Sequence, residues 1–560
     1  MLYFHYVKRH RGEYKMNEMK VSRRQILNNK TYLYLTEFFA GMSLMAVELG
    51  ASRLMAPYFS SSQIVWTIII GTIMIAMALG NIFGGRWADK DPNPDKLYRR
   101  IIIAACWISL IPVLGKYVIL GISGLLIFTV SHNLLVIAAF VTCTVIFVFP
   151  LFLLGTVTPS LVKYTMDSLE DNGRVVGKLN ASNTIGSIIG TFVPTFISIP
   201  AVGTSITFLI FGGILLALSI IYFTSPFSDM KKAHPSKIMV TGIVIFIISI
   251  ILGHNNSFAF WESDIKVEDE SVYNYIKVTE DNRNVILSTN VLFGVQSVYP
   301  KTGGLTGMYY DYAMAAPYMA GLKEKDELDV LILGMGTGTY ATQCLRYYDN
   351  MNFEGVEIDE KIANLAGEYF GLPESVKVTK YDGRAYLNAV DTKYDVIMVD
   401  AYQDISIPFQ MASVEFFTMV RDHLEDDGVM VVNMNMRGTE DGNINQYLSD
   451  TISSVFSEVY TVDIPNYTNR ELFAGKDPKM MERFQNNINI EKNMTLAGLM
   501  TKVNDSLIKY VPGDRIMTDD KAPVELLSMR AIDELVSGEL AYYQDILHEE
   551  GIQGLFDRLL

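Results

Sequence analysis

The sequence predicts two unlike halves: a multi-pass α-helical membrane domain of about seven spans, and an α/β domain with a small β lead-in. Long apolar segments fill the first half, and alternating strands and helices fill the second. The formal net charge of the 560 residues is −15, but it divides unevenly. Residues 1–262 hold 21 Lys and Arg against 12 Asp and Glu, whereas residues 263–560 hold 25 against 49. Such asymmetry is typical of parts that lie in different surroundings.

Seven apolar segments are each long enough to cross a hydrocarbon core of about 30 Å, which takes about 20 helical residues. They lie near 33–56, 64–85, 101–121, 134–158, 179–199, 204–224 and 238–261. We therefore expect a basic cytoplasmic N-terminus over 1–32 and a transmembrane domain over 33–262. Lys and Arg also gather in the loops 86–100, 159–178 and 225–237. The positive-inside rule places these loops in the cytoplasm. An odd number of spans then puts the C-terminal domain on the outer face of the cell membrane.

The second half is expected to divide into a β lead-in over 263–325 and an α/β domain over 326–560. Residues 271–300 alternate in the manner of strands. After them, apolar strands separated by helical stretches are predicted at 328–333, 353–358, 376–379, 395–400 and 428–433. This order favours a mostly parallel, doubly wound sheet. The negative charge argues against nucleic acid as a partner. Three cysteines, two of them in apolar runs, exclude a disulfide scaffold or a cysteine-built zinc site, and no metal is predicted.

A glycine-rich turn follows the first of these strands and contains Gly334, Gly336, Thr337 and Gly338. Glycines allow a tight turn and close approach of a ligand, and Glu357 ends the next strand about 20 residues on. An acid at that place can accept hydrogen bonds from both ribose hydroxyls of a nucleoside. The alternative is a structural turn with an exposed acid.

These motifs, in this order, resemble the spermidine synthases, a family of polyamine aminopropyltransferases with a Rossmann-like, methyltransferase-type fold. The resemblance includes Tyr273-Asn274-Tyr275, Gln296, Tyr309-Tyr310-Asp311, the glycine loop, Val356-Glu357-Ile358-Asp359, Asp382-Gly383-Arg384 and Tyr394 to Asp400. The first half is similar to that of membrane-fused relatives, through Ala56-Pro57-Tyr58-Phe59, Gly84-Gly85-Arg86-Trp87-Ala88-Asp89 and Asn183 to Gly190.

The resemblance implies transfer of an aminopropyl group from decarboxylated S-adenosylmethionine to an amine, with Asp400 as the base. It assigns the ribose to Glu357 and the adenine to Asp382 with Gly383, although Asp382 could instead only cap a helix. The glycine loop would complete the donor site. The implied substrate-binding residues are Asn274, Gln296, Tyr309, Tyr310, Gln403 and Asp404.

Several positions depart from the family pattern. Thr337 replaces an Asp that binds the ammonium of the donor, so S-adenosylmethionine itself becomes an alternative co-substrate. Gln403 replaces an Asp that anchors the acceptor, and Asp404 lies one place late. Asn274 replaces a Gln, and Tyr310 replaces a His. Each lost carboxylate removes a charge-assisted hydrogen bond of about 1.5–3 kcal/mol, which puts diamine specificity in doubt.

Near the C-terminus, Asp519 and Asp520 could line the mouth of the active site and receive a cationic acceptor, or form a solvated turn. The sequence thus favours a membrane-bound transferase with an adenosyl sulfonium donor, whose partners are the lipid bilayer and a small cationic amine. An S-adenosylmethionine-dependent enzyme with another acceptor is the first alternative. The second is a non-enzymatic protein that binds or transports a nucleoside or polyamine. A homo-oligomer is possible under each.

Overall fold

A computed structural model describes residues 24–559 of the chain, apart from 128–129, 131–132, 166–171, 228–235, 255–256, 292–293, 402–406, 436 and 439. The chain divides into two compact units. The first unit comprises residues 1–54, 67–120 and 140–256, and the second comprises 55–66, 121–139 and 257–560.

The apolar first half is helical. Its helices are α2 (Lys30–Phe59), α3 (Gln63–Lys90), α4 (Pro94–Ile127), α5 (Leu134–Cys143), α6 (Phe149–Gly155), α7 (Val157–Thr165), α8 (Asn172–Val193), α9 (Ile199–Thr224) and α10 (Lys237–Gly253). Two π-helical turns, Thr144–Val148 and Pro194–Ser198, join α5 to α6 and α8 to α9. Gly203 has φ +79° and kinks α9.

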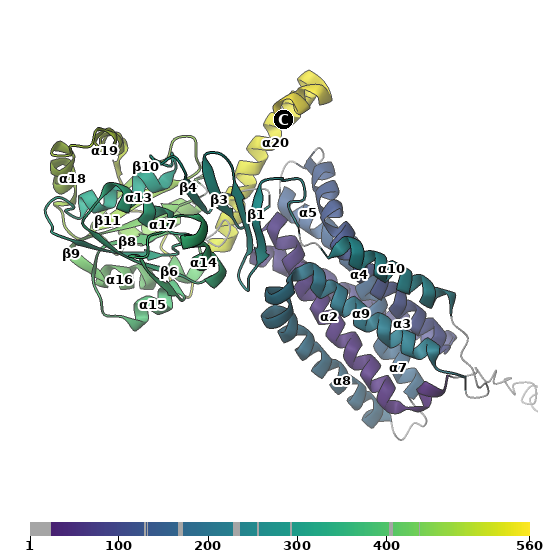
Figure 1. Cartoon of the computed structure of the whole chain (residues 1–560). Helices are drawn as coiled ribbons and strands as arrows, with labels where there is room; N and C mark the ends of the chain where they lie inside the picture. The colour runs from purple at the N-terminus through teal and green to yellow at the C-terminus, as the bar shows by residue number, and fades with distance from the viewer. Residues whose placement is uncertain are drawn as a thin grey trace, which may run out of the picture. The chain divides into compact units, whose positions relative to one another are not determined.

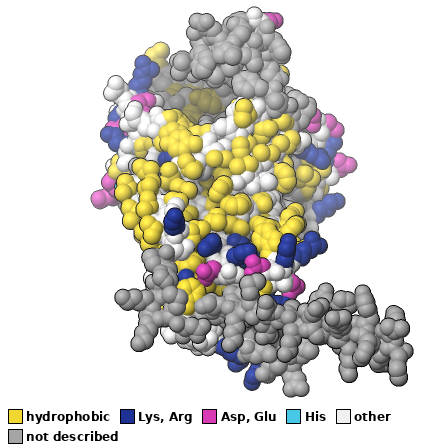
Figure 2. Space-filling model, turned by 90° about the vertical axis from the view of Figure 1, so that its right-hand side faces the viewer, with side chains coloured by type: hydrophobic (Ala, Val, Ile, Leu, Met, Phe, Trp, Pro, Cys, Tyr) yellow, Lys and Arg dark blue, Asp and Glu magenta, His cyan; other side chains and the backbone are white. Residues whose placement is uncertain are grey.

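Five helical stretches of the described residues are long and apolar enough to cross a membrane, and one of them, Gly173–Thr224, is 52 residues long. The helix α10 is shorter than these five stretches. The segment predicted over 238–261 is helical only as far as Gly253. Large apolar side chains are exposed on these helices, among them Met74 (63% exposed), Ile197 (61%) and Ile251 (62%). Figure 2 shows hydrophobic side chains over the middle of one face, with charged side chains towards its margins. Membrane crossing and the number of spans stay predictions.

A buried acid lies inside this helical unit. Glu37 of α2 is fully buried, and its Oε1 accepts hydrogen bonds from the Thr158 hydroxyl (2.5 Å) and from Asn183 Nδ2 (2.8 Å). The helices α2 and α8 can approach closely because Gly186 and Gly190 carry no side chain. A Cβ at either glycine would lie 2.0 Å from a backbone oxygen of α2.

The second unit contains two sheets. The smaller is an antiparallel meander in chain order, formed by β1 (Ile265–Glu270), β2 (Tyr275–Glu280), β3 (Asn284–Ser288) and β4 (Ser297–Pro300). The larger has the order β12-β10-β11-β9-β8-β5-β6-β7. Its strands are β5 (Leu328–Leu333), β6 (Met351–Glu357), β7 (Lys377–Lys380), β8 (Tyr394–Val399), β9 (Leu424–Met434), β10 (Glu458–Asp463), β11 (Arg470–Gly475) and β12 (Ile508–Lys509).

The helices of this unit are α11 (Tyr309–Ala313), α12 (Ala315–Met319), α13 (Thr339–Tyr347), α14 (Glu360–Tyr369), α15 (Gly383–Ala389), α16 (Val414–Asp422), α17 (Ile444–Ser453), α18 (Met480–Asn489), α19 (Met494–Ser506) and α20 (Val524–Leu559). Helices flank the larger sheet (Figure 1), which buries a hydrophobic cluster against each face.

The strands β5 to β9 are parallel, as predicted, and each predicted strand matches an observed one within a few residues. The Rossmann-like, methyltransferase-type α/β fold is therefore confirmed. The antiparallel strands β10, β11 and β12 beyond β9 were not predicted. The strand β5 pairs with β6 on one side and with β8 on the other, so the direction in which the chain adds strands reverses at β5. A ligand crevice is expected outside the carboxyl ends of strands at such a switch point.

Candidate active site

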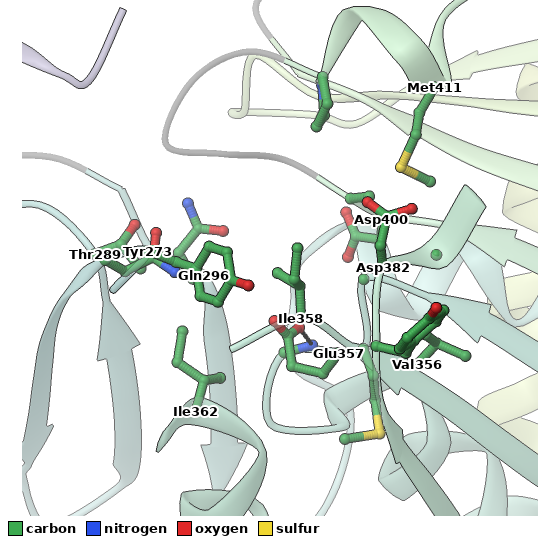
Figure 3. A pocket seen from close by; sticks show the side chains of 18 of the residues that line it. Tyr273, Thr289, Gln296, Val356, Glu357, Ile358, Ile362, Asp382, Asp400 and Met411 are labelled. Atoms are coloured by element: carbon green, nitrogen blue, oxygen red, sulfur yellow. Dashed lines mark hydrogen bonds between the residues drawn. The ribbon is translucent and has the colours of Figure 1, made fainter. Parts of the chain in front are cut away.

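A pocket opens at this switch point and encloses about 970 Å³ of empty space, including its open mouth. Acidic side chains from three strand ends, Glu357, Asp382 and Asp400, lie around it, with Tyr273 and Gln296 across from them (Figure 3). Its apolar walls come from Leu287, Val356, Ile358, Ile362, Pro408 and Met411. Apolar walls with a few convergent polar groups are typical of a small-molecule site.

The glycine loop contributes to the pocket lining. Gly334 has φ +80°, and a Cβ there would lie 2.5 Å from the Cα of Ala401. Gly336 has φ +56°, and Gly338, with φ +81°, caps the N-terminus of α13. Side chains other than glycine rarely adopt these conformations, so the loop sequence follows from its backbone. Gly334 and Gly336 line the pocket.

Glu357 ends β6 and is held by backbone donors. Its Oε2 accepts from the Gly336 N–H (2.8 Å), and its Oε1 accepts from the Asp359 N–H (2.9 Å). Burial raises the pKa of Glu357 to about 7, although these hydrogen bonds act in the opposite direction. The carboxylate keeps acceptor capacity towards the pocket, because each oxygen can accept more than one hydrogen bond.

Asp382 caps a helix and also lines the pocket. Its Oδ1 accepts from the Ala385 N–H (2.7 Å) and so caps α15, while Asp382 and Gly383 also line the pocket. The two alternatives that the sequence left open are therefore compatible.

Asp400 follows β8 directly and is fixed on both oxygens. The Tyr309 hydroxyl donates to Oδ2 (2.7 Å), and Asn433 Nδ2 donates to Oδ1 (2.8 Å). The backbone N–H of Asp400 donates to the carbonyl of Leu333 (2.9 Å), which ties the end of β8 to the glycine loop. Burial raises the pKa of Asp400 to about 7, and the two side-chain donors moderate the rise. A carboxyl in this state can exchange a proton near neutral pH.

Of the remaining predicted substrate residues that the structure describes, two line the pocket and two lie behind its lining. Gln296 and Asn274 line the pocket. However, Asn274 Nδ2 donates to Oδ2 of Asp359 (2.9 Å), so it also supports the N-terminus of α14. Tyr309 and Tyr310 lie behind the pocket lining, with ring centroids 4.0 Å apart and ring planes tilted by 32°, and the Tyr310 hydroxyl donates to the carbonyl of Gln296 (2.6 Å).

Thr337 and Gly338 also lie behind the lining. Thr337 is fully buried, and in the described part of the chain its hydroxyl has no hydrogen-bond partner. Its N–H donates to Ser297 Oγ (3.2 Å). Neither Thr337 nor Gly338 lines the pocket, although both were predicted to contact the aminopropyl donor. Gln403 and Asp404 lie outside the described residues.

The expectation that Asp519 and Asp520 line the mouth needs correction. Asp519 accepts a bidentate ion pair from Arg384 (2.8 and 2.6 Å) and a hydrogen bond from Ser413, so its carboxylate holds the loop to α15 and α16. Asp520 is exposed in a tight turn. Neither residue is part of the pocket lining.

Sequence reasoning missed Asn433 and Glu471. Asn433 ends a predicted apolar strand, and a polar residue at the carboxyl end of a parallel strand is a signal that could have been used. Among the residues that the structure describes, no cluster of three or more His, Cys, Asp or Glu side chains could hold a metal ion.

Comparisons with known proteins identify relatives of this chain. The family described as spermine/spermidine synthase domain matches residues 312–487. A probable polyamine aminopropyl transferase of Bifidobacterium longum strain NCC 2705 is 51% identical over 333 residues, which cover 56% of this chain and 74% of that protein. A polyamine aminopropyltransferase of Oceanobacillus iheyensis is 25% identical over 402 residues, covering 67% of this chain and 74% of that protein.

Among solved structures, a probable spermidine synthase from Corynebacterium glutamicum aligns with 45% of this chain and 99% of its own, at 18% identity and a TM-score of 0.34.

Proposed function

Because this chain belongs to the polyamine aminopropyltransferase family, and is therefore a transferase, we propose that it is membrane-bound and carries an aminopropyl group from decarboxylated S-adenosylmethionine to a small amine. The observation that carries the proposal is Asp400, a carboxyl with a pKa of about 7 at the edge of a pocket with nucleoside-binding features.

The donor would bind through its nucleoside. The carboxylate of Glu357 is oriented by the Gly336 and Asp359 N–H groups and can accept hydrogen bonds from the ribose hydroxyls. Asp382 lies where it can accept from the adenine amino group, with the base between the apolar walls of Ile358 and Met411. The sulfonium end then faces Asp400. The lining therefore provides hydrogen-bond acceptors for a nucleoside.

The proposed step is a displacement at carbon. The lone pair of the acceptor amine forms a bond to the methylene next to sulfur, the C–S bond breaks, and its electron pair leaves on a neutral thioether, methylthioadenosine. The new ammonium loses a proton, which Asp400 accepts. The sulfonium is a good leaving group, so the protein contributes mainly by aligning the amine and keeping it unprotonated.

The test is product analysis on the purified full-length chain. Methylthioadenosine released from decarboxylated donor together with a diamine supports the proposal. Adenosylhomocysteine released from S-adenosylmethionine would instead support an enzyme with another acceptor. Donor binding without either product would support a binding protein and contradict transfer.

We further propose that the helical first half spans the cell membrane, with the N-terminus in the cytoplasm and the second half outside. The exposed apolar side chains support this, because large apolar surface is costly in water. The native cysteines are buried, so one engineered thiol can report each side. An impermeant maleimide should label Asp520→Cys in intact cells, and Lys90→Cys only after permeabilisation. The reverse pattern would contradict the proposed orientation.

A further inference from the structure

A carboxyl group lies in the interior of the helical first half, where three helices meet. The side chain of Glu37 on α2 is 0% exposed. Its Oε1 accepts hydrogen bonds from the Thr158 hydroxyl of α7 (2.5 Å) and from Asn183 Nδ2 of α8 (2.8 Å). Its Oε2 is also buried, and no group of the described chain forms a hydrogen bond with it. The two oxygens of this carboxyl group therefore have different surroundings.

The difference between the two oxygens fits a carboxylic acid that carries its proton. A protonated carboxyl has a carbonyl oxygen, which only accepts hydrogen bonds, and a hydroxyl oxygen, which holds the proton. Oε1 of Glu37 has two donors and corresponds to the carbonyl, so Oε2 corresponds to the hydroxyl. An ionised carboxylate would share its charge between both oxygens and leave part of it at Oε2 without a donor. A buried charge of this kind is costly, and such a group becomes neutral instead.

The side chains next to Glu37 supply no positive charge that could stabilise a carboxylate. Thr158 and Asn183 do not ionise. Thr36, the residue before Glu37, contacts the Tyr98 hydroxyl of α4 (3.0 Å). A tyrosine hydroxyl can be neutral or negative, but never positive.

Ionisable side chains farther along the neighbouring helices bind other groups. On α2 itself, Lys30 and Glu48 lie about 10 and 16 Å from Glu37 along the helix axis. On α8, Arg174 and Lys178 are exposed. The contacts of α4, α7 and α9 join Asp95 to Arg24, Tyr222 to Asp95, Arg100 to Ser160, Lys163 to Asp89 and the Tyr164 hydroxyl to the Asn93 carbonyl. Within the described residues, no Lys or Arg forms an ion pair with Glu37. Loss of its proton would therefore leave a buried charge uncompensated.

Close helix packing separates Glu37 from water. A Cβ at Gly186 of α8 would lie 2.0 Å from the carbonyl oxygen of Phe38, the residue after Glu37. A Cβ at Gly41 of α2 would lie 2.7 Å from the carbonyl oxygen of Asn183. The two backbones thus touch within about one turn of the carboxyl group. Because the side chain has no exposed surface, water can hydrate an ionised Glu37 only if α2 moves away from α7 or α8. Release of the proton and separation of the helices are therefore linked.

We propose that Glu37 is a proton-binding site of the helical first half, and that loss of its proton is coupled to separation of α2 from α7 and α8. The O–H bond at Oε2 breaks, its electron pair stays on the carboxylate, and the proton passes to water that enters between the helices. The ligand is a proton rather than a metal ion, because Thr158 and Asn183 direct hydrogen atoms at Oε1, whereas hard metal cations bind oxygen lone pairs. Ionisable side chains enclosed in transmembrane bundles mark ion pathways and proton relays. Glu37 belongs to the first unit and the pocket to the second, so the inference does not depend on aminopropyl transfer.

The test is a reporter thiol near Glu37 in the full-length protein, held in lipid nanodiscs. Ser187 of α8 is half-buried, and its hydroxyl donates to the Gly41 carbonyl of α2 (3.4 Å), so Ser187→Cys reports access between these two helices. The rate of labelling by N-ethylmaleimide is measured from about pH 6 to about pH 9, with and without Glu37→Gln. The amide of that variant matches the protonated acid in shape but cannot ionise. Because thiol ionisation raises both rates alike, their ratio isolates the contribution of Glu37.

The labelling rate with Glu37 present should rise about 10-fold or more relative to the Glu37→Gln rate over this pH range, since ionisation favours the separated helices. The matched control is Glu48→Gln, which removes a half-buried acid three turns along α2 and should keep the wild-type pH dependence. A chain with only the native cysteines, which are buried, provides the blank. An unchanged ratio overturns the proposal. Loss of the pH dependence in Glu48→Gln also overturns it, because the effect would not be specific to Glu37.

A second measurement needs no substitution and decides the question if Glu37→Gln does not fold. Dicyclohexylcarbodiimide reacts with protonated carboxyl groups in apolar surroundings, and peptide mass spectrometry locates the adduct. Glu37 should be modified several-fold more at about pH 6 than at about pH 9, relative to Glu48 as the internal reference. Absence of the adduct at Glu37, or an equal pH dependence at both acids, overturns the proposal. Neither measurement uses an aminopropyl donor or acceptor, so a chain that fails to transfer leaves both results decisive.

Discussion

Replacement of Asp400 by Asn tests the proposed base with little change in shape. The introduced amide can keep both contacts: its oxygen can accept from Asn433 Nδ2, and its NH₂ can donate to the Tyr309 oxygen, at the positions where the wild-type distances are 2.8 and 2.7 Å. The fold and the donor site should therefore persist, and only proton acceptance is lost. A positioned general base contributes about 10²- to 10⁴-fold. We expect kcat to fall about 10³-fold, equivalent to about 4 kcal/mol of transition-state stabilisation.

The pH dependence of the free energy of unfolding provides a second, independent test of the Asp400 carboxyl. The pKa of about 7 in the folded protein lies above the ordinary Asp value of about 3.9. Between these values the folded chain binds more protons than the unfolded chain, so the free energy of unfolding of the wild type falls as pH rises from about 4 to 7. The full loss is up to about 4 kcal/mol, reduced by the remaining solvent contact of Asp400. Asp400→Asn should lack this loss and be the more stable protein above pH 7.

The assay is methylthioadenosine release at saturating donor, followed by mass spectrometry from about pH 6 to pH 9. Saturating donor removes the contribution of Glu357, whose pKa is also about 7. Wild-type turnover should rise through about pH 7 as Asp400 ionises, and the variant should lack that rise. Calorimetry with methylthioadenosine serves as the control for an intact donor site. Turnover of Asp400→Asn within about threefold of wild type would refute the role of Asp400 as base.

Three further substitutions probe the rest of the site. Glu357→Gln places an NH₂ donor against a backbone N–H, so methylthioadenosine affinity by calorimetry should fall about 10- to 100-fold; undiminished affinity would exclude Glu357 from the nucleoside site. Gly334→Ala forces a Cβ to within 2.5 Å of Ala401 at φ +80° and should cost about 1–3 kcal/mol in thermal unfolding; an unchanged melting temperature would contradict that strain. Asp519→Asn removes the exposed pair with Arg384, so stability should fall by no more than about 1 kcal/mol and turnover should not change; a large loss of turnover would return Asp519 to the active site.

The parts of the site that sequence could predict are local. Glu357 ends a strand, Asp382 and Asp400 follow their strands within two residues, and parallel strands present their carboxyl ends at one edge of a sheet. The glycine loop likewise follows from its own backbone. Pattern, spacing and the parallel order were enough to bring these residues together.

Other features depend on pairing between distant segments, which no local pattern contains. The local sequence predicts that Asp519 receives a cationic substrate, but its carboxylate is paired with Arg384, which lies 135 positions away in the chain. Glu37 lies in a long apolar segment, and only the packing of three helices shows that it is buried against Thr158 and Asn183. Glu471 lies on an antiparallel strand that the strand–helix alternation did not predict.

Glu471 is a buried acid that makes the folded domain less stable as pH rises. It lies level with Asp400 across Asn433, and in the described chain only Asp400 of the two acids has hydrogen-bond donors. Burial raises the pKa of Glu471 well above the ordinary Glu value, and the charge of Asp400 raises it further. The unfolded chain therefore releases this proton at a lower pH than the folded chain, so the free energy of unfolding falls as pH rises above the ordinary Glu pKa. Glu471→Gln cannot ionise and should melt at a higher temperature than the wild type at neutral pH, whereas a lower melting temperature would show that the Glu471 carboxyl supports the fold.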